Sequence, residues 1–581
     1  MRKTKIICTI GPASIDDGIL KNLMQNGMDV ARVNLSHSTF EYSSTIIEKI
    51  KRIRAELGLP IGIMFDTKGP EVRMMKFKDG KAMLTEGQNF ILTTDKNHIG
   101  DETMAAVSYE KLTDDVGPGT RILIDDGLIE LKVTGVEDEQ IHCKVINGGF
   151  VADRKGVNVP SVKLAMPFVS EVDRNDISHG IDQGIDFIAA SFATCADDIL
   201  KIREILDEKN CHSIRIIAKI ENREGVNNID EILKVSDGIM IARGDMGVEI
   251  PLQELPAIQK KLIAKAYNAG LQVITATQML ESMIKNPRPT RAESTDVANA
   301  IYDGTSAIML SGETAAGLYP IEAVKVMATI AEWTENDIDY KRRFQLRDYG
   351  ESHSVTNAIS HATCTTAYDL GAKAIITVTK SGLTARMISK YRPSIPIVSF
   401  TTEEYILRHL NLSWGVIPMY LEELESTEDL FDQAVENAQK AGLVENGDLV
   451  VITAGVPLGV SGTTNLLKVH IVGDVLVSGR GIGLNSVCGN LCVCKDEADA
   501  LQNFKDGDIL VIPQTSNSVM SILKKAKGII TETDGLNTHA AVVGLTLDIP
   551  VITGAENATK LLKSGTTVTI DAARGLVSSN S

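Results

Sequence analysis

The chain has 581 residues, of which 43% are hydrophobic, and this exceeds what one hydrophobic core supports, so we expect about three or four domains. Its 59 basic and 76 acidic side chains give a net charge of −17, which argues against nucleic acid or an anionic membrane as the main partner. Neither a membrane span nor a secretory signal is evident, and eight cysteines are too few for a disulfide framework, so we expect a soluble cytoplasmic protein.

From the N-terminus, short β-branched runs alternate with helical patterns. The predicted strands are residues 5–10, 29–35 and 60–67, and the predicted helices are residues 16–27 and 40–57. Such alternation is typical of parallel βαβ units. The alternation stops at Lys68, and from about residue 71 to 166 short strands and turns predict an inserted small all-β domain.

After Phe168 the alternation of strands and helices resumes. Five further strands are predicted at residues 185–192, 214–221, 238–245, 271–278 and 306–313. Together with the first three they make about eight parallel strands, which suggests a TIM (β/α)8 barrel with its active site at the carboxyl ends of the strands. A doubly wound open sheet would alternate in the same way, so the pattern alone leaves that architecture open.

Each of the eight predicted strands ends on a polar residue. These residues are Thr9, Asn34, Asp66, Ser191, Glu221, Asp245, Thr277 and Glu313. Because strand side chains alternate between faces, Lys219 and Glu221 point the same way, and the crossover that follows can bring Asp245 close to Glu221. This arrangement is typical of a metal-assisted site.

Two further regions follow the barrel pattern. Residues from about 350 to 473 again alternate strands and helices and predict a separate small α/β domain. Beyond Gly473 the sequence pattern changes to glycine-rich strands, which predict a fourth domain of about 105 residues.

The motifs at the strand endings identify a family resemblance. They are TIGPAS from Thr9, ARVNLSH from Ala31, DTKGPEVR from Asp66, AKIENREGV from Ala218, ARGDMGVEI from Ala242, TATQMLESM from Thr275, PRPTRAE from Pro287 and MLSGETAAG from Met309. With these motifs in order, residues 1–473 resemble the pyruvate kinase family. Residues 475–581, through GRGIGLNSVCG and DGLNTHAAVVGLTLDIPVITG, resemble the swivelling phosphohistidine domain of phosphoenolpyruvate-utilising enzymes.

The resemblance implies four domains. They are a TIM-barrel catalytic domain (1–70 and 168–345), an inserted β-barrel lid domain (71–167), an α/β regulatory domain (346–473) and an extra C-terminal α/β domain (474–581). It also implies phosphoryl transfer from phosphoenolpyruvate to ADP, giving pyruvate and ATP. The expected assembly is a homotetramer.

By resemblance, Glu221 and Asp245 hold Mg²⁺ or Mn²⁺, and Lys219 stabilises the migrating phosphoryl group and the enolate. The other expected catalytic or substrate-binding residues are Arg32, Gly244, Thr277 and Ser311. Ser311 is also explained almost as well by a helix cap after the eighth strand. Arg243 fits a structural role better than a catalytic one.

The resemblance implies a K⁺ site and a nucleotide site. The expected K⁺ ligands are Asn34, Ser36, Asp66 and Thr67, and the expected nucleotide residues are Pro12, Asn34, His37, Tyr42 and Arg73. Glu71 favours K⁺ dependence, because K⁺-independent relatives place a lysine there. Val172 stands where many relatives have a lysine, which puts a nucleotide contact in doubt, while Asp125 and Asp126 lie in a turn of the expected lid.

A phosphorylated small-molecule effector is expected at a strand-to-helix loop of the regulatory domain. Its residues are Thr379, Lys380, Ser381, Gly382 and Thr384. An ordinary helix cap is the alternative, and fructose 1,6-bisphosphate, ribose 5-phosphate and AMP all remain open as effectors. His539 falls at the phosphohistidine position, but we expect a structural or assembly role for its domain, because the chain lacks an ATP-grasp partner.

Two other functions are consistent with parts of the pattern. A metal-dependent lyase or aldolase acting on pyruvate enolate would use a similar carboxylate pair, but it needs neither the lid insertion nor the K⁺ ligands. A non-catalytic sugar-phosphate sensor would keep the fold, but the intact Lys219, Glu221, Asp245 and Thr277 argue against it.

Overall fold

The computed structural model describes residues 1–579 except 161, 348–353, 425, 457–463 and 474, and it leaves the side chain of His37 undescribed. The chain forms two compact units. The first comprises residues 1–352, 380–394 and 401–420, and the second comprises residues 353–379, 395–400 and 421–581. Among the described residues, no helix is long and apolar enough to cross a membrane.

Eight parallel strands of the first unit close into a barrel. They are β1 (Lys5–Thr9), β2 (Val30–Asn34), β3 (Gly62–Asp66), β13 (Phe187–Ala190), β14 (Arg215–Ile220), β15 (Gly238–Ala242), β16 (Gln272–Ala276) and β17 (Ala307–Leu310). Their order is β1-β17-β16-β15-β14-β13-β3-β2, and β1 pairs with both β17 and β2. This closure confirms the barrel and excludes the doubly wound open sheet.

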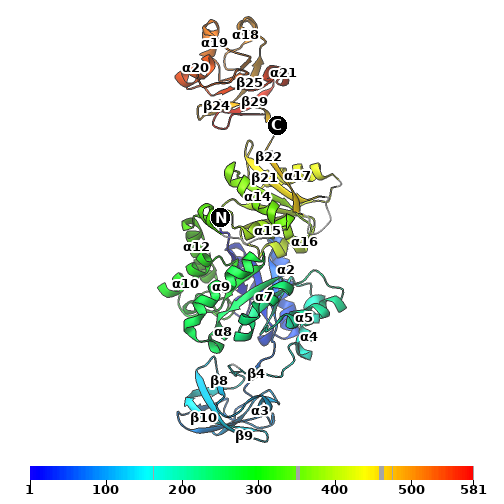
Figure 1. The fold of residues 1–581 in the computed structure, drawn as a ribbon, viewed down its shortest axis with the longest axis vertical. Helices are drawn as coiled ribbons and strands as arrows, with labels where there is room; N and C mark the ends of the chain where they lie inside the picture. Colours follow the sequence, from blue (N-terminus) through cyan, green and yellow to red (C-terminus); the bar gives the residue numbers. More distant parts are fainter. Residues whose placement is uncertain (161, 348–353, 425, 457–463, 474, 580–581) are drawn as a thin grey trace. The chain divides into compact units, whose positions relative to one another are not determined.

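Helices surround the barrel (Figure 1). They include α1 (Asp17–Gln25), α2 (Phe40–Leu57), α4 (Glu171–Asp182), α5 (Ala196–Glu208), α6 (Arg223–Asn227), α7 (Ile229–Val235), α8 (Arg243–Glu249), α9 (Leu255–Asn268), α10 (Arg291–Asp303), α11 (Gly312–Ala315) and α12 (Pro320–Asp337). Capping boxes at Ser170 and Thr290 start α4 and α10, and Gly58, at φ 64°, ends α2. Fully buried side chains such as Phe187, Met240 and Ile274 fill the barrel interior, so polar residues collect at its rim.

The inserted segment forms β-sheets of its own around a separate hydrophobic core. Its strands are β4 (Val72–Arg73), β5 (Lys81–Leu84), β6 (Asn89–Thr93), β7 (Met104–Ala106), β8 (Arg121–Ile124), β9 (Ile129–Glu137), β10 (Gln140–Asn147), β11 (Gly149–Ala152) and β12 (Gly156–Asn158), with one helix, α3 (Leu112–Asp115). Seven strands pair in the order β4-β12-β8-β9-β10-β6-β7, and β5 pairs with β11. An antiparallel bridge between Met74 and Val107, just beyond the two edge strands, brings the ends of the seven-stranded sheet together.

After α13 (Tyr340–Leu346), the chain contributes an α/β region to both units. In the second unit, β18 (Ala374–Val378), β19 (Ile397–Thr401), β21 (Leu449–Gly455) and β22 (Thr464–Ile471) pair in the order β19-β18-β21-β22, with α14 (Val355–Asp369) and α17 (Thr427–Lys440). Helices α15 (Leu383–Lys390) and α16 (Glu404–Leu410) and strand β20 (Val416–Tyr420) belong to the first unit.

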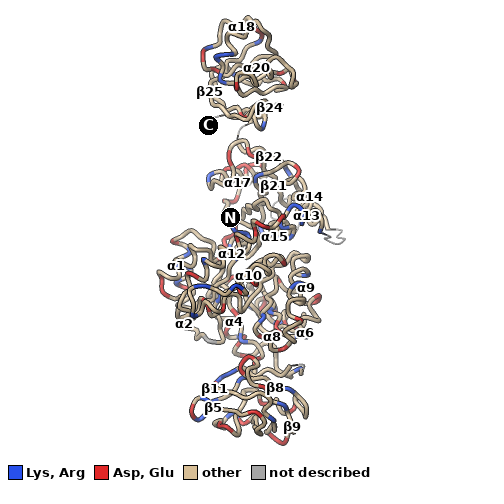
Figure 2. Tube along the Cα trace, turned by 90° about the vertical axis from the view of Figure 1, so that its left-hand side faces the viewer, with Lys and Arg blue, Asp and Glu red and all other residues tan. Residues whose placement is uncertain are grey.

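The C-terminal region has an eight-stranded sheet of its own, in the order β23-β30-β29-β25-β26-β27-β28-β24. Its strands are β23 (Val475–Ser478), β24 (Arg480–Ile482), β25 (Ser486–Val493), β26 (Ile509–Ile512), β27 (Gly528–Thr531), β28 (Val551–Thr553), β29 (Thr567–Asp571) and β30 (Leu576–Ser579). Its helices are α18 (Glu497–Asn503), α19 (Met520–Leu523), α20 (His539–Leu547) and α21 (Ala558–Leu561). Basic and acidic residues are interspersed along the trace of the chain (Figure 2).

Candidate active site

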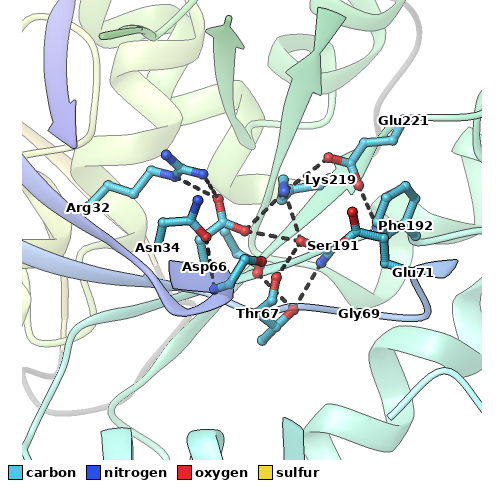
Figure 3. Close-up of polar contacts among 12 residues, drawn as sticks. Arg32, Asn34, Asp66, Thr67, Gly69, Glu71, Ser191, Phe192, Lys219 and Glu221 are labelled. Atoms are coloured by element: carbon cyan, nitrogen blue, oxygen red, sulfur yellow. Dashed lines mark hydrogen bonds and ion pairs between the residues drawn. The ribbon is translucent and has the colours of Figure 1, made fainter. Parts of the chain in front are cut away.

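A buried ionic cluster lies at the carboxyl ends of neighbouring barrel strands (Figure 3). Asp66, the last residue of β3, is its centre. Arg32 Nε on β2 donates to Asp66 Oδ2 at 2.6 Å, and Lys219 Nζ on β14 donates to Asp66 Oδ1 at 3.0 Å. Because β2, β3, β13 and β14 are consecutive in the barrel, residues far apart in sequence meet at this rim.

Lys219 has three oxygen partners. Besides Asp66, its ammonium donates to Ser191 Oγ at 2.8 Å and lies 2.9 Å from Glu221 Oε1. Burial alone lowers the pKa of an ammonium, but the carboxylates of Asp66 and Glu221 outweigh this effect and raise the pKa of Lys219. Lys219 is therefore a permanent buried cation.

Glu221 is fully buried. Its second oxygen, Oε2, accepts a hydrogen bond of 2.6 Å from the backbone N–H of Phe192, a residue held at the left-handed φ of 59°. Desolvation, reinforced by the negative charges of Asp245 and Asp66, raises the pKa of Glu221 to about 7 in spite of Lys219. A cation bound beside such a carboxylate would stabilise its charged form.

The carboxylates of Glu221 and Asp245 suit a divalent ion of the Mg²⁺ type. Asp245 lies in the first turn of α8, close enough to raise the pKa of Glu221. Among the described residues, no group of three or more His, Cys, Asp or Glu side chains is arranged as a metal cage. Two carboxylates fit Mg²⁺, which proteins commonly bind through one or two carboxylates together with water and substrate oxygens.

The four residues expected to bind K⁺ lie at or just after the ends of β2 and β3, and Asp66 is also the centre of the cluster. The side-chain oxygen of Asn34 accepts from the backbone N–H of Ser36 at 3.1 Å, and Thr67 Oγ1 accepts from the N–H of Ser191 at 3.1 Å. Ser191 Oγ lies 3.0 Å from Asp66 Oδ1 and 2.7 Å from the carbonyl oxygen of Thr67. The group therefore offers hydroxyl, amide, carbonyl and carboxylate oxygens, a donor set that suits a monovalent cation.

Thr277 and Gln278 follow β16 in a left-handed conformation, with φ values of 67° and 53°. Thr277 Oγ1 accepts from the backbone N–H of Gly244 at 2.7 Å, so that amide is engaged by the protein itself. Arg243 donates to the carbonyl oxygen of Thr277 at 2.8 Å and pairs with Asp296 at 2.7 Å. Arg243 thus holds the strained turn, in agreement with the structural role expected for it.

Ser311 occupies the N-cap position of α11, but its side chain makes no capping hydrogen bond. Its Oγ is buried without a hydrogen-bond partner among the described residues. The backbone N–H of Ser311 instead donates to Glu313 Oε2 at 2.7 Å, and Glu313 Oε1 accepts from the N–H of Leu280 at 3.0 Å. The helix-cap explanation of the Ser311 hydroxyl is therefore wrong.

The residues expected at the nucleotide site are only partly described. Pro12 is exposed, Tyr42 Oη has no hydrogen-bond partner among the described residues, and the side chain of His37 lies outside them. Arg73 donates to Glu71 at 2.8 Å. In the inserted domain, Asp125 and Asp126 have φ values of 55° and 54°, and the charge of Asp245 adds to desolvation in raising the pKa of Asp126.

The sequence predicts two more sets of functional residues. In the strand-to-helix loop, Gly382 has a φ of 76° and precedes α15, Lys380 is exposed, Ser381 is half-buried and Thr384 is buried, while Thr379 belongs to the second unit. In the C-terminal region, Nδ1 of His539 lies 3.0 Å from Thr515 Oγ1 and Nε2 lies 3.1 Å from Asn517 Oδ1.

The structure adds two groups to the site that the sequence patterns did not single out for a role. The sequence predicts Ser191 only as a polar strand ending, yet it links Lys219, Asp66 and Thr67. The sequence patterns do not predict the amide of Phe192. The group that donates to Glu221 is a backbone N–H, which every residue except proline carries, so the residue type at this position could not predict the contact.

Three family models match the chain. The pyruvate kinase barrel domain matches residues 1–324, the pyruvate kinase alpha/beta domain matches residues 357–470, and the mobile domain of PEP-utilising enzymes matches residues 504–575. The pyruvate kinase of Bacillus licheniformis is 50% identical over 579 residues, covering 99% of both chains. That of Geobacillus stearothermophilus is 50% identical over 578 residues, covering 99% of this chain and 98% of its own.

A solved structure agrees with these matches. The crystal structure of a pyruvate kinase from Cryptosporidium parvum superposes with a TM-score of 0.76 at 40% identity, covering 81% of this chain and 96% of its own.

Proposed function

This chain belongs to the pyruvate kinase family and transfers the phosphoryl group of phosphoenolpyruvate to ADP, and we propose that the ionic cluster around Asp66 is where it does so. The observation that carries the proposal is the buried ammonium of Lys219, held by Asp66, Ser191 and Glu221. In the reaction, the bond from phosphorus to the enol oxygen breaks and a bond to a terminal oxygen of ADP forms.

Arg32 and Lys219 provide the positive charge that this transfer needs. Phosphoryl transfer depends on positioning and on stabilising charge spread over the phosphate oxygens. Both cations are buried, and Asp66 fixes both. Arg32, with its planar fork, orients the substrate phosphate, while Lys219 faces the migrating group and the enolate that remains.

Glu221 and Asp245 would hold Mg²⁺, or Mn²⁺ in its place, and the bound ion supplies positive charge to substrate oxygens. Asn34, Ser36, Asp66 and Thr67 would hold K⁺. Glu71 supports this assignment, because its side chain is paired with Arg73 and adds no cation to the site.

Once the phosphoryl group has left, the enolate of pyruvate takes a proton at carbon. Hydroxyls do not titrate near neutrality, so Thr277 and Ser311 would relay or position a proton rather than act as acids by themselves. The unpartnered Ser311 hydroxyl supports this role, because it is available for a new hydrogen bond. Binding of the substrate carboxylate at Gly244 and Asp245 requires that Thr277 release the amide of Gly244.

For the nucleotide, we assign Pro12, Asn34, His37, Tyr42 and Arg73. The inserted domain would act as a lid that excludes water, and it carries Asp125 and Asp126 in a turn where the charge of Asp245 acts on Asp126. Val172 is 51% exposed and apolar, so it provides no ionic contact for ADP.

The finer organisation is also proposed. We assign residues 1–70 and 168–345 to the catalytic barrel, 71–167 to the lid, 346–473 to a regulatory domain and 474–581 to an extra domain. Thr379, Lys380, Ser381, Gly382 and Thr384 would bind a phosphorylated effector at the start of α15. We further propose that the protein is a cytoplasmic homotetramer.

Steady-state kinetics test the proposed function. We expect pyruvate and ATP to form from phosphoenolpyruvate and ADP, with dependence on both Mg²⁺ and K⁺, and sigmoidal kinetics relieved by the effector. Formation of pyruvate without ATP would favour the lyase alternative. Absence of any turnover, with sugar-phosphate binding retained, would favour the sensor.

A further inference from the structure

A small cavity, open to solvent on one side and with an internal volume of about 10 Å³, lies within the first unit, away from the ionic cluster. Gln272, which begins β16, and Ser306, which precedes β17, form part of its wall. These positions are at the amino ends of barrel strands, whereas the ionic cluster lies at the carboxyl ends. The rest of the wall comes largely from α15 and the residues after it, with Trp414.

The charged side chains in this wall are all cations: Arg386, Lys390 and Arg392. Aspartate and glutamate are absent from the described lining. Buried charges in proteins are ordinarily paired, because an unpaired one loses its hydration without compensation. Among the described residues, Arg386 and Arg392 have no ion pair with a carboxylate.

Arg386 forms no ion pair with a carboxylate of the residues that the structure describes. Its Nε is buried without a hydrogen-bond partner among the described residues. The acidic group that acts on it is Asp237, whose carboxylate already accepts from Arg215 at 2.6 Å and from Arg203 at 3.0 Å. Burial, together with the charge of Arg215, lowers the pKa of Arg386 to about 10.

Arg392 likewise has no ion pair with a carboxylate among the described residues. Its Nη2 donates to the carbonyl oxygen of Gly304 at 2.9 Å and to Ser306 Oγ at 3.1 Å, and its Nη1 donates to the carbonyl oxygen and Oγ of Ser389, both at 3.2 Å. The guanidinium stacks 4.8 Å from the ring centre of Trp414. Its Nε has no hydrogen-bond partner among the described residues, and burial lowers its pKa to about 9.

Among the described residues, the carboxylate that acts on Arg392 is that of Glu335, and it is engaged elsewhere. Glu335 accepts from the backbone N–H groups of Lys3 and Thr4 at 2.7 and 2.6 Å. The nearby Arg347 adds a further positive charge. The guanidinium groups of Arg386 and Arg392 thus share a cavity without a dedicated counterion among the described residues.

We infer that a phosphate oxyanion binds at the open side of this cavity, held by the guanidinium fork of Arg386 and by Nε of Arg392. A guanidinium group presents its donors in a planar fork that matches phosphate oxygens, and the charges of two such groups match a dianion. Because one side of the cavity is open, the ligand is either inorganic phosphate or the phosphate group of a monoester whose remainder extends into solvent.

The chain contains a built-in reporter for this site. It has two tryptophans, of which Trp333 is 76% exposed on α12 and Trp414 is buried in the cavity wall. In the full-length Trp333→Phe variant, tryptophan fluorescence reports Trp414 alone. Titration with inorganic phosphate, at constant ionic strength set with chloride, should give a saturable change in emission that chloride itself does not produce.

Two charge variants made in the Trp333→Phe background identify the binding group. Arg386→Gln should weaken phosphate binding by about tenfold or more, because it removes charge-assisted hydrogen bonds. Arg174→Gln removes the same charge from the surface pair with Glu208 and should leave the affinity unchanged. Lys380→Gln, in the expected effector loop, should also leave the Trp414 response in place, which separates the two sites.

The ligand source is decided by competition with glycerol 3-phosphate, a simple phosphate monoester. Displacement of inorganic phosphate by the monoester supports a metabolite site, and a response to inorganic phosphate alone supports an ion site. The inference is overturned if Trp414 shows no saturable response to either anion, or if folded Arg386→Gln binds phosphate as tightly as its parent. If Arg386→Gln does not fold, the titration of the Trp333→Phe protein still decides.

Discussion

Lys219 and Asp66, 153 positions apart in sequence, form a 3.0 Å ion pair in which both side chains are buried. Asp66 simultaneously accepts from Arg32, so one carboxylate fixes two cations at the rim of the barrel. This sharing explains how two like charges are held side by side. It also means that Asp66 determines where both cations point.

The first prediction concerns Lys219. Lys219→Ala should lower kcat by a factor of about 10³ or more, because the buried cation that faces the migrating phosphoryl group is lost. Turnover is measured by coupling pyruvate formation to a dehydrogenase, and folding by circular dichroism. Lys21→Ala, which removes an exposed lysine paired with Glu56, is the matched control and should keep normal activity. Near-normal turnover of Lys219→Ala would contradict the assigned role.

The second prediction concerns K⁺. At constant ionic strength, replacing K⁺ by a large organic cation should abolish most activity, because the oxygens of Asn34, Ser36, Asp66 and Thr67 lack their ion. Glu71→Lys should restore activity in K⁺-free buffer, because an ammonium at this position replaces the ion. Glu71→Gln is the control that removes the carboxylate without adding a cation. Full activity of the parent protein without K⁺ would rule the site out.

The third prediction separates two roles of Ser311. An N-cap hydroxyl contributes about 1 kcal/mol to stability, but Ser311 makes no capping hydrogen bond. Ser311→Ala should therefore change the free energy of unfolding by less than about 0.5 kcal/mol while lowering kcat. Thr290→Ala, which removes a capping box, should cost about 1 kcal/mol and serves as the comparison. A loss of stability in Ser311→Ala equal to that of Thr290→Ala, with kcat unchanged, would reverse the assignment.

The fourth prediction concerns acid stability. His409 is buried between Phe187 and Tyr405, and neither ring nitrogen has a hydrogen-bond partner among the described residues. Burial, reinforced by Arg215, lowers the pKa of His409 to about 3, below the ordinary value of 6.5. The unfolded chain therefore binds a proton between about pH 6.5 and 3 that the folded chain does not, so this residue destabilises the fold as pH falls through that window.

His409→Phe keeps an aromatic ring at this position and removes the titratable imidazole. Its free energy of unfolding should fall less on acidification, with a difference from the parent of about 1.4 kcal/mol for each pH unit below 6.5. Urea unfolding at pH 7.5, 5.5 and 4.5 measures this. His212→Gln, an exposed histidine near Asp207, is the control. If the free energies of unfolding of His409→Phe and the parent fell equally with pH, His409 would not be the source of the acid sensitivity.

The strand endings illustrate what local sequence patterns predict well. Lys219 and Glu221 are two positions apart on one strand, so their common direction follows from strand geometry, and the structure places them 2.9 Å apart. The same reasoning could not find the Phe192 amide, because a left-handed backbone on a different strand ending depends on tertiary packing. Nor could it find the cavity at Arg386 and Arg392, whose wall combines residues 267–306 with residues 386–414.

The sequence by itself determined the alternating strands and helices, the inserted β segment and the polar strand endings, because each depends on local periodicity and turn chemistry. Only the tertiary structure decided that the eight strands close into a barrel, because closure requires β1 to pair with β17, about 300 residues away. The tertiary structure also decided the pKa of the ionisable groups in the site. Burial and the convergence of Asp66, Asp245 and Lys219 raise the pKa of Glu221 to about 7, and desolvation cannot be read from residue order.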